Sequence, residues 1–235
     1  MNKSFTRSVA RVAAIGSVLA AARLLAPAGV AAADPYPNSV ATVTHLKLTR
    51  NIAQYGDITR ARVRVTDGGL AGTPDGSITL RVFGHVRTKQ LSNGRAVFRL
   101  PRRLPAQATY TVRAKYHAPA GSRYMESRRH THYTVVKANT RAHARAHDVT
   151  RHHRPFVHVR VNSDTGLTPH GDVRVRLMKN GHPRRSTTGT LVHGVVNVRF
   201  RPIWGLGEWT AKVIYLGHPN FQRDVVRNTF RVTRS

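Results

Sequence analysis

The sequence of 235 residues contains no cysteine. A disulfide framework, a cysteine-ligated zinc site and a thiol nucleophile are therefore all excluded. Acidic residues are also scarce, because 10 Asp and Glu stand against 39 Lys and Arg, which gives a formal net charge of +29. An acid-rich calcium protein does not fit so few carboxylates. Apolar residues still make up 40% of the chain, so any domain must be held together by its apolar core alone.

Long hydrophobic runs are missing except near the N-terminus. Basic residues precede an apolar stretch at residues 12–25, and three alanines end the segment at residue 33. A basic region, an apolar region and an A-x-A site in this order predict a secretory signal peptide over residues 1–33. An uncleaved membrane anchor is the alternative, but the stretch is shorter than the ~20 residues that span a bilayer and contains Arg23. We expect the mature chain to be secreted and to carry no membrane span.

Apolar and mostly basic residues alternate in short runs through the rest of the sequence. Residues 58–65, 78–82, 96–100 and 110–116 all show this period of two. Such a period places successive side chains on opposite faces of a β-strand. Turn residues such as Asn93-Gly94 separate the runs, and no later segment has helical periodicity. The pattern predicts an all-β sandwich or barrel.

The second half of the chain repeats the first about 96 residues later. The matching segments are 73–76 with 168–171, 93–100 with 193–200, and 110–116 with 209–215. Two domains of about 95 residues with about seven strands each are the size of immunoglobulin-like sandwiches. We therefore predict an all-β protein of two tandem immunoglobulin-like β-sandwich domains after an N-terminal signal peptide. The predicted boundaries are 34–39 for an N-terminal extension, 40–137 for the first domain and 138–235 for the second.

Several short motifs occur in the same order in the first copy, namely Tyr55-Gly56, residues 76–78, residues 94–96, residues 110–116 and Tyr124. The second copy lacks the Tyr-Gly pair but ends its repeat with residues 215–221, Tyr-Leu-Gly-His-Pro-Asn-Phe. In these features the sequence resembles tandem bacterial Ig-like repeat domains of secreted and surface proteins, over residues 40–233. The resemblance implies a stalk, spacer or adhesive module. His218 stands where that family often has aspartate.

The alternation also determines where the charge lies. If Ala61, Val63 and Val65 face the core, the arginines between them project outward in a row. Arginine outnumbers lysine 32 to 7, and its guanidinium binds phosphate or sulfate through two hydrogen bonds. The candidate polyanion-binding residues are Arg60, Arg62, Arg64, Arg95 and Arg99 in the first copy, and Arg160, Arg174, Arg176 and Arg199 in the second.

We expect non-catalytic binding to an anionic cell-wall polymer, an acidic polysaccharide or another polyanion, with marked salt sensitivity. The alternative is a structural spacer or an extracellular protein–protein interaction module in which the charge is incidental, since exposed charge also keeps strand edges from pairing. No recognition helix or RNA-stacking motif is visible, so no specific nucleic acid is expected. Retention on a polyanion that collapses with salt separates the first hypothesis from the second.

Metal, cofactor and catalytic sites are not expected. Histidines cluster at residues 143–153, but His143 and His147 on one strand are ~13 Å apart, too far to share an ion. No Gly-x-Ser-x-Gly motif occurs, and Glu126 and Glu208 are the only glutamates, so the chain is not predicted to be an enzyme. An exposed Trp204 is a possible sugar-stacking residue.

Two copies of one predicted core follow from the same alternation. Trp209 is expected in the core because it aligns with Tyr110. The other predicted core residues are Val63, Val65, Leu80, Phe98, Val112 and Tyr116, with their copies Val159, Val161, Val175, Val198, Ala211 and Tyr215.

Overall fold

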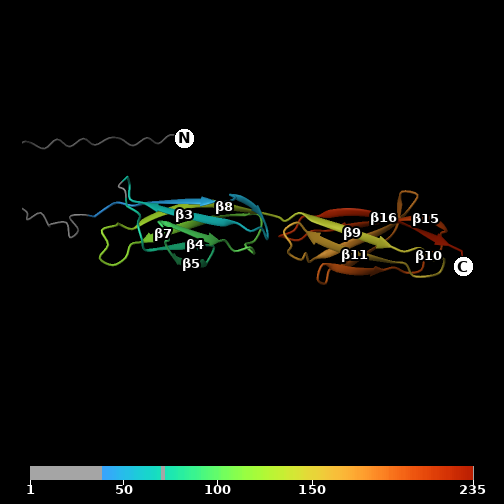
Figure 1. Ribbon diagram of the computed structural model, residues 1–235. Coiled ribbons are helices and arrows are strands. Elements are labelled where there is room, and N and C mark those ends of the chain that lie inside the picture. The colour runs from blue at the N-terminus through green and yellow to red at the C-terminus, as the bar shows by residue number, and fades with distance from the viewer. Residues whose placement is uncertain (1–38, 70–71, 235) are drawn as a thin grey trace, which may run out of the picture. The chain divides into compact units, whose positions relative to one another are not determined.

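The computed structural model describes residues 39–69 and 72–234. The predicted signal peptide, 1–33, and nearly all of the predicted extension, 34–39, lie outside the described residues. Within the described residues all regular structure is β-strand, and the prediction of an all-β chain is confirmed (Figure 1). None of these residues belongs to a helix long and apolar enough to cross a membrane.

The first repeat is a sandwich of two antiparallel sheets with one short parallel addition. Its strands are β1 (Val43–Leu48), β2 (Ile52–Gln54), β3 (Arg60–Thr66), β4 (Ser77–Val82), β5 (His85–Gln90), β6 (Arg95–Arg99), β7 (Ala108–His117) and β8 (Ser127–Val136). One sheet has three strands in the order β1-β3-β6, and the other has five in the order β2-β8-β7-β4-β5. The chain changes sheets between β1 and β2, and β2 then pairs parallel to β8. This switch closes one side of the sandwich.

The second repeat has the same topology. Its strands are β9 (Thr140–Ala146), β10 (Val149–Thr150), β11 (Phe156–Ser163), β12 (Asp172–Lys179), β13 (His182–Thr190), β14 (Val195–Arg199), β15 (Gly207–Tyr215) and β16 (Asp224–Thr233). The sheets are β14-β11-β9 and β10-β16-β15-β12-β13, and β10 pairs parallel to β16 as β2 does to β8. Two tandem immunoglobulin-like sandwiches are therefore present, as the repeated sequence predicted.

The cores are built from the inward residues of the alternating strands. All twelve paired core predictions are buried, and so is Trp209. One detail differs from the sequence prediction, because β3 begins at Arg60 and Ile58 lies exposed before it. Thr59 fills the buried position there, where its hydroxyl accepts a hydrogen bond from Tyr133 (3.1 Å).

A tyrosine on β7 and its copy on β15 tie each sandwich together. The Tyr116 hydroxyl donates to the Asp75 carbonyl (2.6 Å), and the Tyr215 hydroxyl donates to the His170 carbonyl (2.7 Å). A glycine follows each acceptor, and at Gly76 a Cβ would clash with the His117 carbonyl oxygen. Burial raises the pKa of both tyrosine hydroxyls to about 12, so they stay protonated donors. The glycine, the strand and the tyrosine recur in this order in both repeats. We call the hydrogen bond from the tyrosine hydroxyl to the turn carbonyl the turn clamp.

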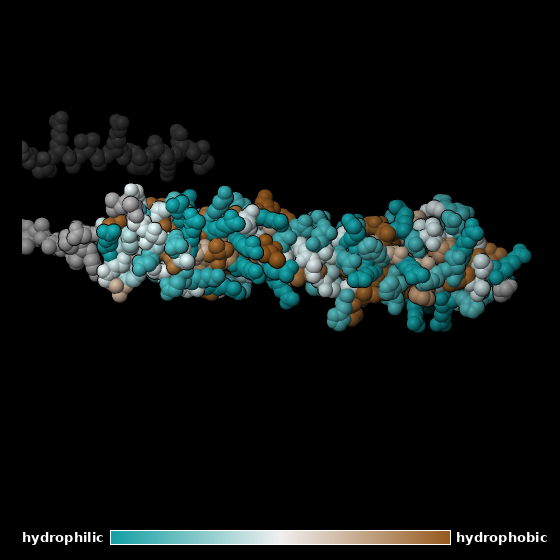
Figure 2. Space-filling model, viewed as in Figure 1, coloured by the Kyte–Doolittle hydropathy of each residue, from teal (hydrophilic) through white to brown (hydrophobic). Residues whose placement is uncertain are grey.

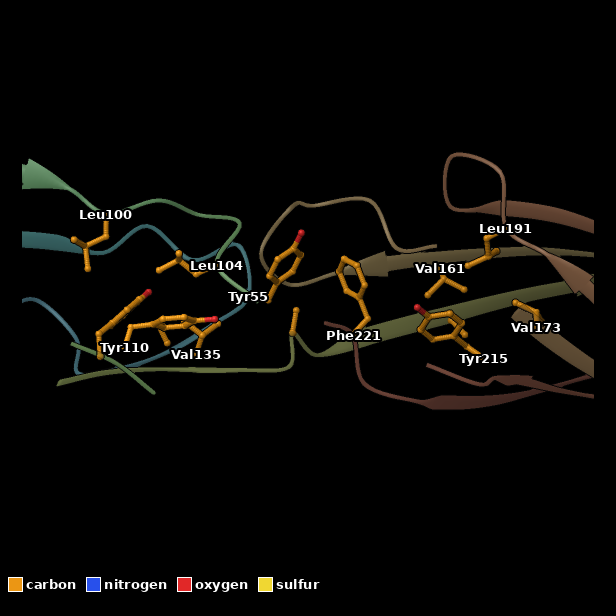
Figure 3. Close-up of a cluster of buried hydrophobic side chains, with 14 of the residues drawn as sticks. Tyr55, Leu100, Leu104, Tyr110, Val135, Val161, Val173, Leu191, Tyr215 and Phe221 are labelled. Carbon is orange, nitrogen blue, oxygen red and sulfur yellow. The ribbon is translucent and has the colours of Figure 1, made fainter. Parts of the chain in front are cut away.

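The two sandwiches meet through a packed junction. Only residues 137–139 separate β8 from β9, and Ala138 is fully buried. The rings of Tyr55 and Phe221 pack edge to face with centroids 5.4 Å apart (Figure 3). Arg102 donates both to the Gly56 carbonyl of its own repeat (2.7 Å) and to the Thr165 carbonyl of the next (2.9 Å). The junction thus combines apolar packing with directed hydrogen bonds.

A histidine pair lies beside this junction. The His170 and His218 rings are 5.0 Å apart, and both lie near Phe221. His218 Nδ1 is buried and has no hydrogen-bond partner among the described residues. Desolvation, with smaller contributions from His170 and Lys137, lowers the pKa of His218. The neutral imidazole is therefore the form that the folded junction favours.

Removing either clamping hydroxyl should destabilise its own sandwich. Tyr116→Phe and Tyr215→Phe each leave a carbonyl without its donor, and we expect each to lower the free energy of unfolding by about 1–2 kcal/mol. The two effects should be nearly additive, because the residues lie in different repeats. Urea denaturation of the single and double variants checks this, and unchanged midpoints in both single variants would contradict the clamp.

Mild acid should lower the stability of the folded protein through protonation of His218 at the junction. Because the folded pKa of His218 is lowered, the unfolded chain binds the proton more readily. Neutral His218 makes its full contribution to the free energy of unfolding above pH 6.5, which is about the pKa of histidine in the unfolded chain. This contribution is lost as the pH falls from that value toward the lower pKa of the folded state. We expect the Tm to drop between pH 7.5 and pH 5.5, and to drop less in His218→Asn, by differential scanning calorimetry. An equal drop in both proteins would assign the acid sensitivity to other groups.

Candidate anion-binding surfaces

Five of the predicted arginines share the outer face of the sheet β1-β3-β6. We call this surface the three-strand face; its members are His45, Lys47, Arg60, Arg62, Arg64, Arg95, Val97 and Arg99. Each is exposed, while the residues between them on the same strands are buried or partly buried. The alternation that buries Val63 thus gathers the predicted first-copy arginines on one surface.

Pairing across the strands places arginines directly opposite arginines. Arg60 lies opposite Arg99, and Arg64 lies opposite Arg95. Directly opposed residues on one face of a sheet have Cβ atoms only ~5 Å apart, and like charges there destabilise the sheet. His45 extends the row of Arg64 on the other side, and Lys47 lies opposite Arg62. The three-strand face therefore concentrates positive charge at a cost to stability.

Carboxylates do not compensate this charge. Within the described part of the chain three ion pairs form: Arg50–Asp57 (3.0 Å), Lys115–Glu126 (2.7 Å) and His117–Glu126 (3.0 Å). None of them involves the three-strand face. Its cations are thus left to water and to ions from solution.

A shallow groove of about 420 Å³ crosses the three-strand face. Val97 forms its apolar floor and is 45% exposed, with Arg62 directly opposite it. Lysine and arginine stems line the sides, and the charged ends reach solvent. An apolar floor with charged walls suits a ligand that combines a carbon skeleton with anionic groups.

The predicted residues of the second repeat do not form an equivalent surface. Arg160 lies opposite Val195, and Arg199 lies opposite Phe156, so no two arginines face each other across β11 and β14. Asparagines also accept hydrogen bonds here, as Asn162 does from Arg160 (3.2 Å). Arg141, His143 and Arg145 lie exposed on the edge strand β9 and add further basic residues to this sheet. The charge of this sheet is more widely spaced than that of the first repeat.

Arg174 and Arg176 lie on the other sheet of the second repeat. Arg174 is opposite Ile214 and Arg176 is opposite Lys212. Both arginines are half-buried, and Ile214, which points outward between β12 and β16, is buried. The arginine stems here cover an apolar side chain. These two residues thus belong to a different surface from Arg160 and Arg199.

A further basic surface was missed at the sequence level. The five-strand face is the outer face of the sheet β2-β8-β7-β4-β5, and its basic members are Arg81, Arg113, Lys115, Arg128, His130 and His132. Arg81, Arg113 and His130 lie in one row across β4, β7 and β8. The signal was present, because Arg81 and Arg113 alternate with buried residues as Arg60 and Arg62 do. Their proximity depends on strand pairing.

The five-strand face has one acidic residue at its margin. Glu126 accepts from Lys115 and His117, and the Lys115 hydrogen bond is the main reason that the pKa of Glu126 lies below its ordinary value. A groove of about 640 Å³ runs among Arg81, Arg113 and Arg128. Figure 2 shows hydrophilic side chains spread over the visible surface of both repeats, with apolar patches between them.

The two tryptophans considered in the sequence analysis lie in different environments. Trp204 is 65% exposed and its ring packs edge to face against His152, with centroids 4.2 Å apart. Trp209 instead donates its indole N–H to the Gly205 carbonyl (2.7 Å), the counterpart of the Tyr110 bond to Pro105. Among the described residues, no three His, Asp or Glu side chains are placed to hold a metal ion.

No family model matches the sequence, and no curated protein matches it. Solved structures that resemble the chain include fibronectin III-like modules, a titin Z1Z2 chimera and bacterial α-2-macroglobulins. A two-domain fibronectin type III segment of chicken tenascin has a TM-score of 0.43 at 10% identity, covering 80% of this chain and 97% of that one. The fibronectin(III)-like modules of Clostridium thermocellum CbhA give 0.31 at 9% identity, covering 82% and 95%. A chimeric titin Z1Z2 gives 0.32 at 14% identity, covering 84% and 99%.

These likenesses concern the fold alone, and they leave the bacterial repeat family suggested by the motifs a prediction.

Replacing one arginine of an opposed pair should stabilise the protein. Arg64→Glu removes repulsion with Arg95 and introduces attraction, so we expect a gain of about 0.5 kcal/mol at low salt. The gain should shrink as salt screens the charges. Urea denaturation at low and high salt measures it, with Arg184→Glu as the control, since Arg184 has no directly opposite partner in the β12–β13 register. A gain in the control as large as in Arg64→Glu would reflect net charge rather than the opposed pair.

Proposed function

We propose that this protein is a non-catalytic binding module for a linear anionic polymer, held on the three-strand face of its first repeat. The observation that carries the proposal is the direct opposition of Arg60 with Arg99 and of Arg64 with Arg95. Opposed like charges lower stability, and the described chain supplies no carboxylate to relieve them. An anionic ligand would remove this repulsion on binding.

The spacing of the arginines favours a repetitive ligand. Alternate residues of one strand are ~6.8 Å apart, and neighbouring strands are ~4.8 Å apart. Arg60, Arg62 and Arg64 thus offer three evenly spaced guanidinium groups along β3. An extended polymer with a sulfate or phosphate group at a similar interval can place one group on each arginine, through two hydrogen bonds. The groove floor at Val97 can contact the polymer backbone between those groups.

The force in such binding is mainly electrostatic. Each polymer charge that an arginine neutralises releases a condensed counterion, so affinity falls steeply with salt. All regular structure among the described residues is strand, so none of it matches the recognition helix of the common DNA-binding motifs. The ligand class is therefore an acidic polysaccharide or a phosphate polymer, recognised by charge spacing.

The proposed place of action is outside the cytoplasm. The predicted signal peptide at residues 1–33 supports this, and a secreted protein meets the anionic polymers of a cell surface directly. The high net charge would keep the protein at such a surface without a covalent anchor.

A spacer is the second candidate function, and the packed junction favours it. The repeats are joined by a short connection at residues 137–139, which is supported by the Tyr55–Phe221 contact and the two Arg102 hydrogen bonds. Such a junction suits a spacer that holds two other domains or molecules at a distance. A spacer does not need the opposed arginines. The two functions therefore differ in what happens when those arginines are removed.

The test compares retention of the full chain on immobilised heparin and on immobilised polyphosphate across a salt gradient. Cytochrome c serves as a basic reference protein. The face variant is R60Q/R64Q/R95Q/R99Q, and the control R184Q/R201Q/R223Q/R234Q removes the same number of charges from exposed positions of the second repeat that have no directly opposite residue. We expect wild type and the control to elute at clearly higher salt than cytochrome c, and the face variant to elute at clearly lower salt than either of them.

The salt dependence gives a second measure. Each arginine that contacts the polymer contributes roughly 0.7–0.9 to the slope of log affinity against log salt, so the face variant should lose roughly 3 from that slope. Equal losses in the face and control variants would mean that net charge alone decides retention, and the spacer function would then take precedence. Heparin retention without polyphosphate retention would select sulfated polysaccharides, and the reverse would select phosphate polymers.

A further inference from the structure

The first repeat carries basic surfaces on both of its sheets. On β3 the inward residues are Ala61, Val63 and Val65, and on β4 they are Ile78, Leu80 and Val82; all six are buried in one core. The arginines that alternate with these residues must point away from the core on opposite sides. The three-strand face and the five-strand face are thus the two outer surfaces of one sandwich.

The five-strand face repeats the features that carry the proposed function. Arg81 on β4 and Arg113 on β7 are directly opposed like charges, as Arg64 and Arg95 are. His130 continues their row, and Lys115 with Arg128 forms a parallel row beside it. Glu126 at the margin holds Lys115 in place and leaves the arginines free of acidic partners among the described residues. A second anionic chain can therefore bind here.

We propose that the first repeat is bivalent and bridges two separate anionic polymer chains, one on each face. This inference rests on the proposed function, because it assumes that opposed arginine rows bind such polymers. The ligand on the five-strand face has the same chemistry, an extended chain bearing sulfate or phosphate groups. The protein would thereby cross-link the polymers of a surface as well as attach to them.

Geometry separates the two sites. The sheets of a sandwich lie ~10 Å apart, and outward arginines add their own length on each side. Along the β1–β8 side, uncharged hydroxyls close the edge, where Thr42 and Thr44 hydrogen-bond Ser127 (both 2.7 Å). A short anionic oligosaccharide laid on one face does not reach the other. The first repeat therefore presents two separate sites to short ligands. One long polymer can instead reach both faces by wrapping around the edge of the sandwich opposite β1 and β8.

Two-step capture tests bivalence with the full chain. Heparin is immobilised, the protein is bound and washed, and a fluorescent short heparin oligosaccharide is then added. Either face can hold the immobilised heparin, which forms the first layer. Neutralising one face should therefore leave binding to this first layer intact and abolish capture of the fluorescent oligosaccharide, which forms the second layer. The variants are R60Q/R64Q/R95Q/R99Q for the three-strand face and R81Q/R113Q/K115Q/R128Q for the five-strand face, and the four residues of the second set all belong to its outer surface.

The control is the same second-repeat variant, R184Q/R201Q/R223Q/R234Q, which matches the charge removed. Normalised to bound protein, second-layer capture should fall at least about fivefold in each face variant and less than about twofold in the control. Thermal melts confirm that each variant is folded. Capture that falls equally in the control, or that persists in either face variant, would overturn bivalence. Failure of wild type to bind the first layer would instead overturn the proposed function itself.

Discussion

Alternation along each strand is the constraint on which the rest of this structure depends. It decides the core and the charge distribution at once, because every inward valine or tyrosine fixes the direction of the arginine next to it. Without cysteine, the buried set must hold each sandwich alone. Much of the excess positive charge therefore lies on the outer faces of the sheets, where strand pairing brings arginines together.

That arrangement carries an internal conflict. A sheet gains stability when opposite residues attract, yet Arg60 and Arg64 each face another arginine. The second repeat shows that the same fold does not require this, because Arg160 and Arg199 face Val195 and Phe156 instead. The three-strand sheet thus carries opposed arginines in the first repeat and none in the second, where Lys212 lies opposite Arg176 and Arg227 on the other sheet. This difference between the two three-strand sheets supports the binding role proposed for the three-strand face of the first repeat.

The junction between the repeats has a role separate from that of the strand faces, because its contacts connect one repeat to the other. Tyr55 and Phe221 contact each other because the loops that carry them lie at adjoining ends of the two sandwiches, and Ala138 is buried between β8 and β9. Neutral His218 belongs to this packed region. Contacts of this kind limit how freely the repeats move, so a polymer bound on the first repeat would keep the second near it. Binding and spacing are therefore compatible in one chain.

The sequence by itself determined the fold class, the tandem repeat, the core and the outward direction of Arg60, Arg62 and Arg64, because each follows from local periodicity or from comparing the halves. It did not determine neighbours across strands. The opposition of Arg60 and Arg99, the row of Arg81, Arg113 and His130, and the isolation of Arg160 from Arg199 all depend on register between segments far apart in the chain. Only the tertiary structure decided these, since turns and core packing set the register while alternation fixes merely the face.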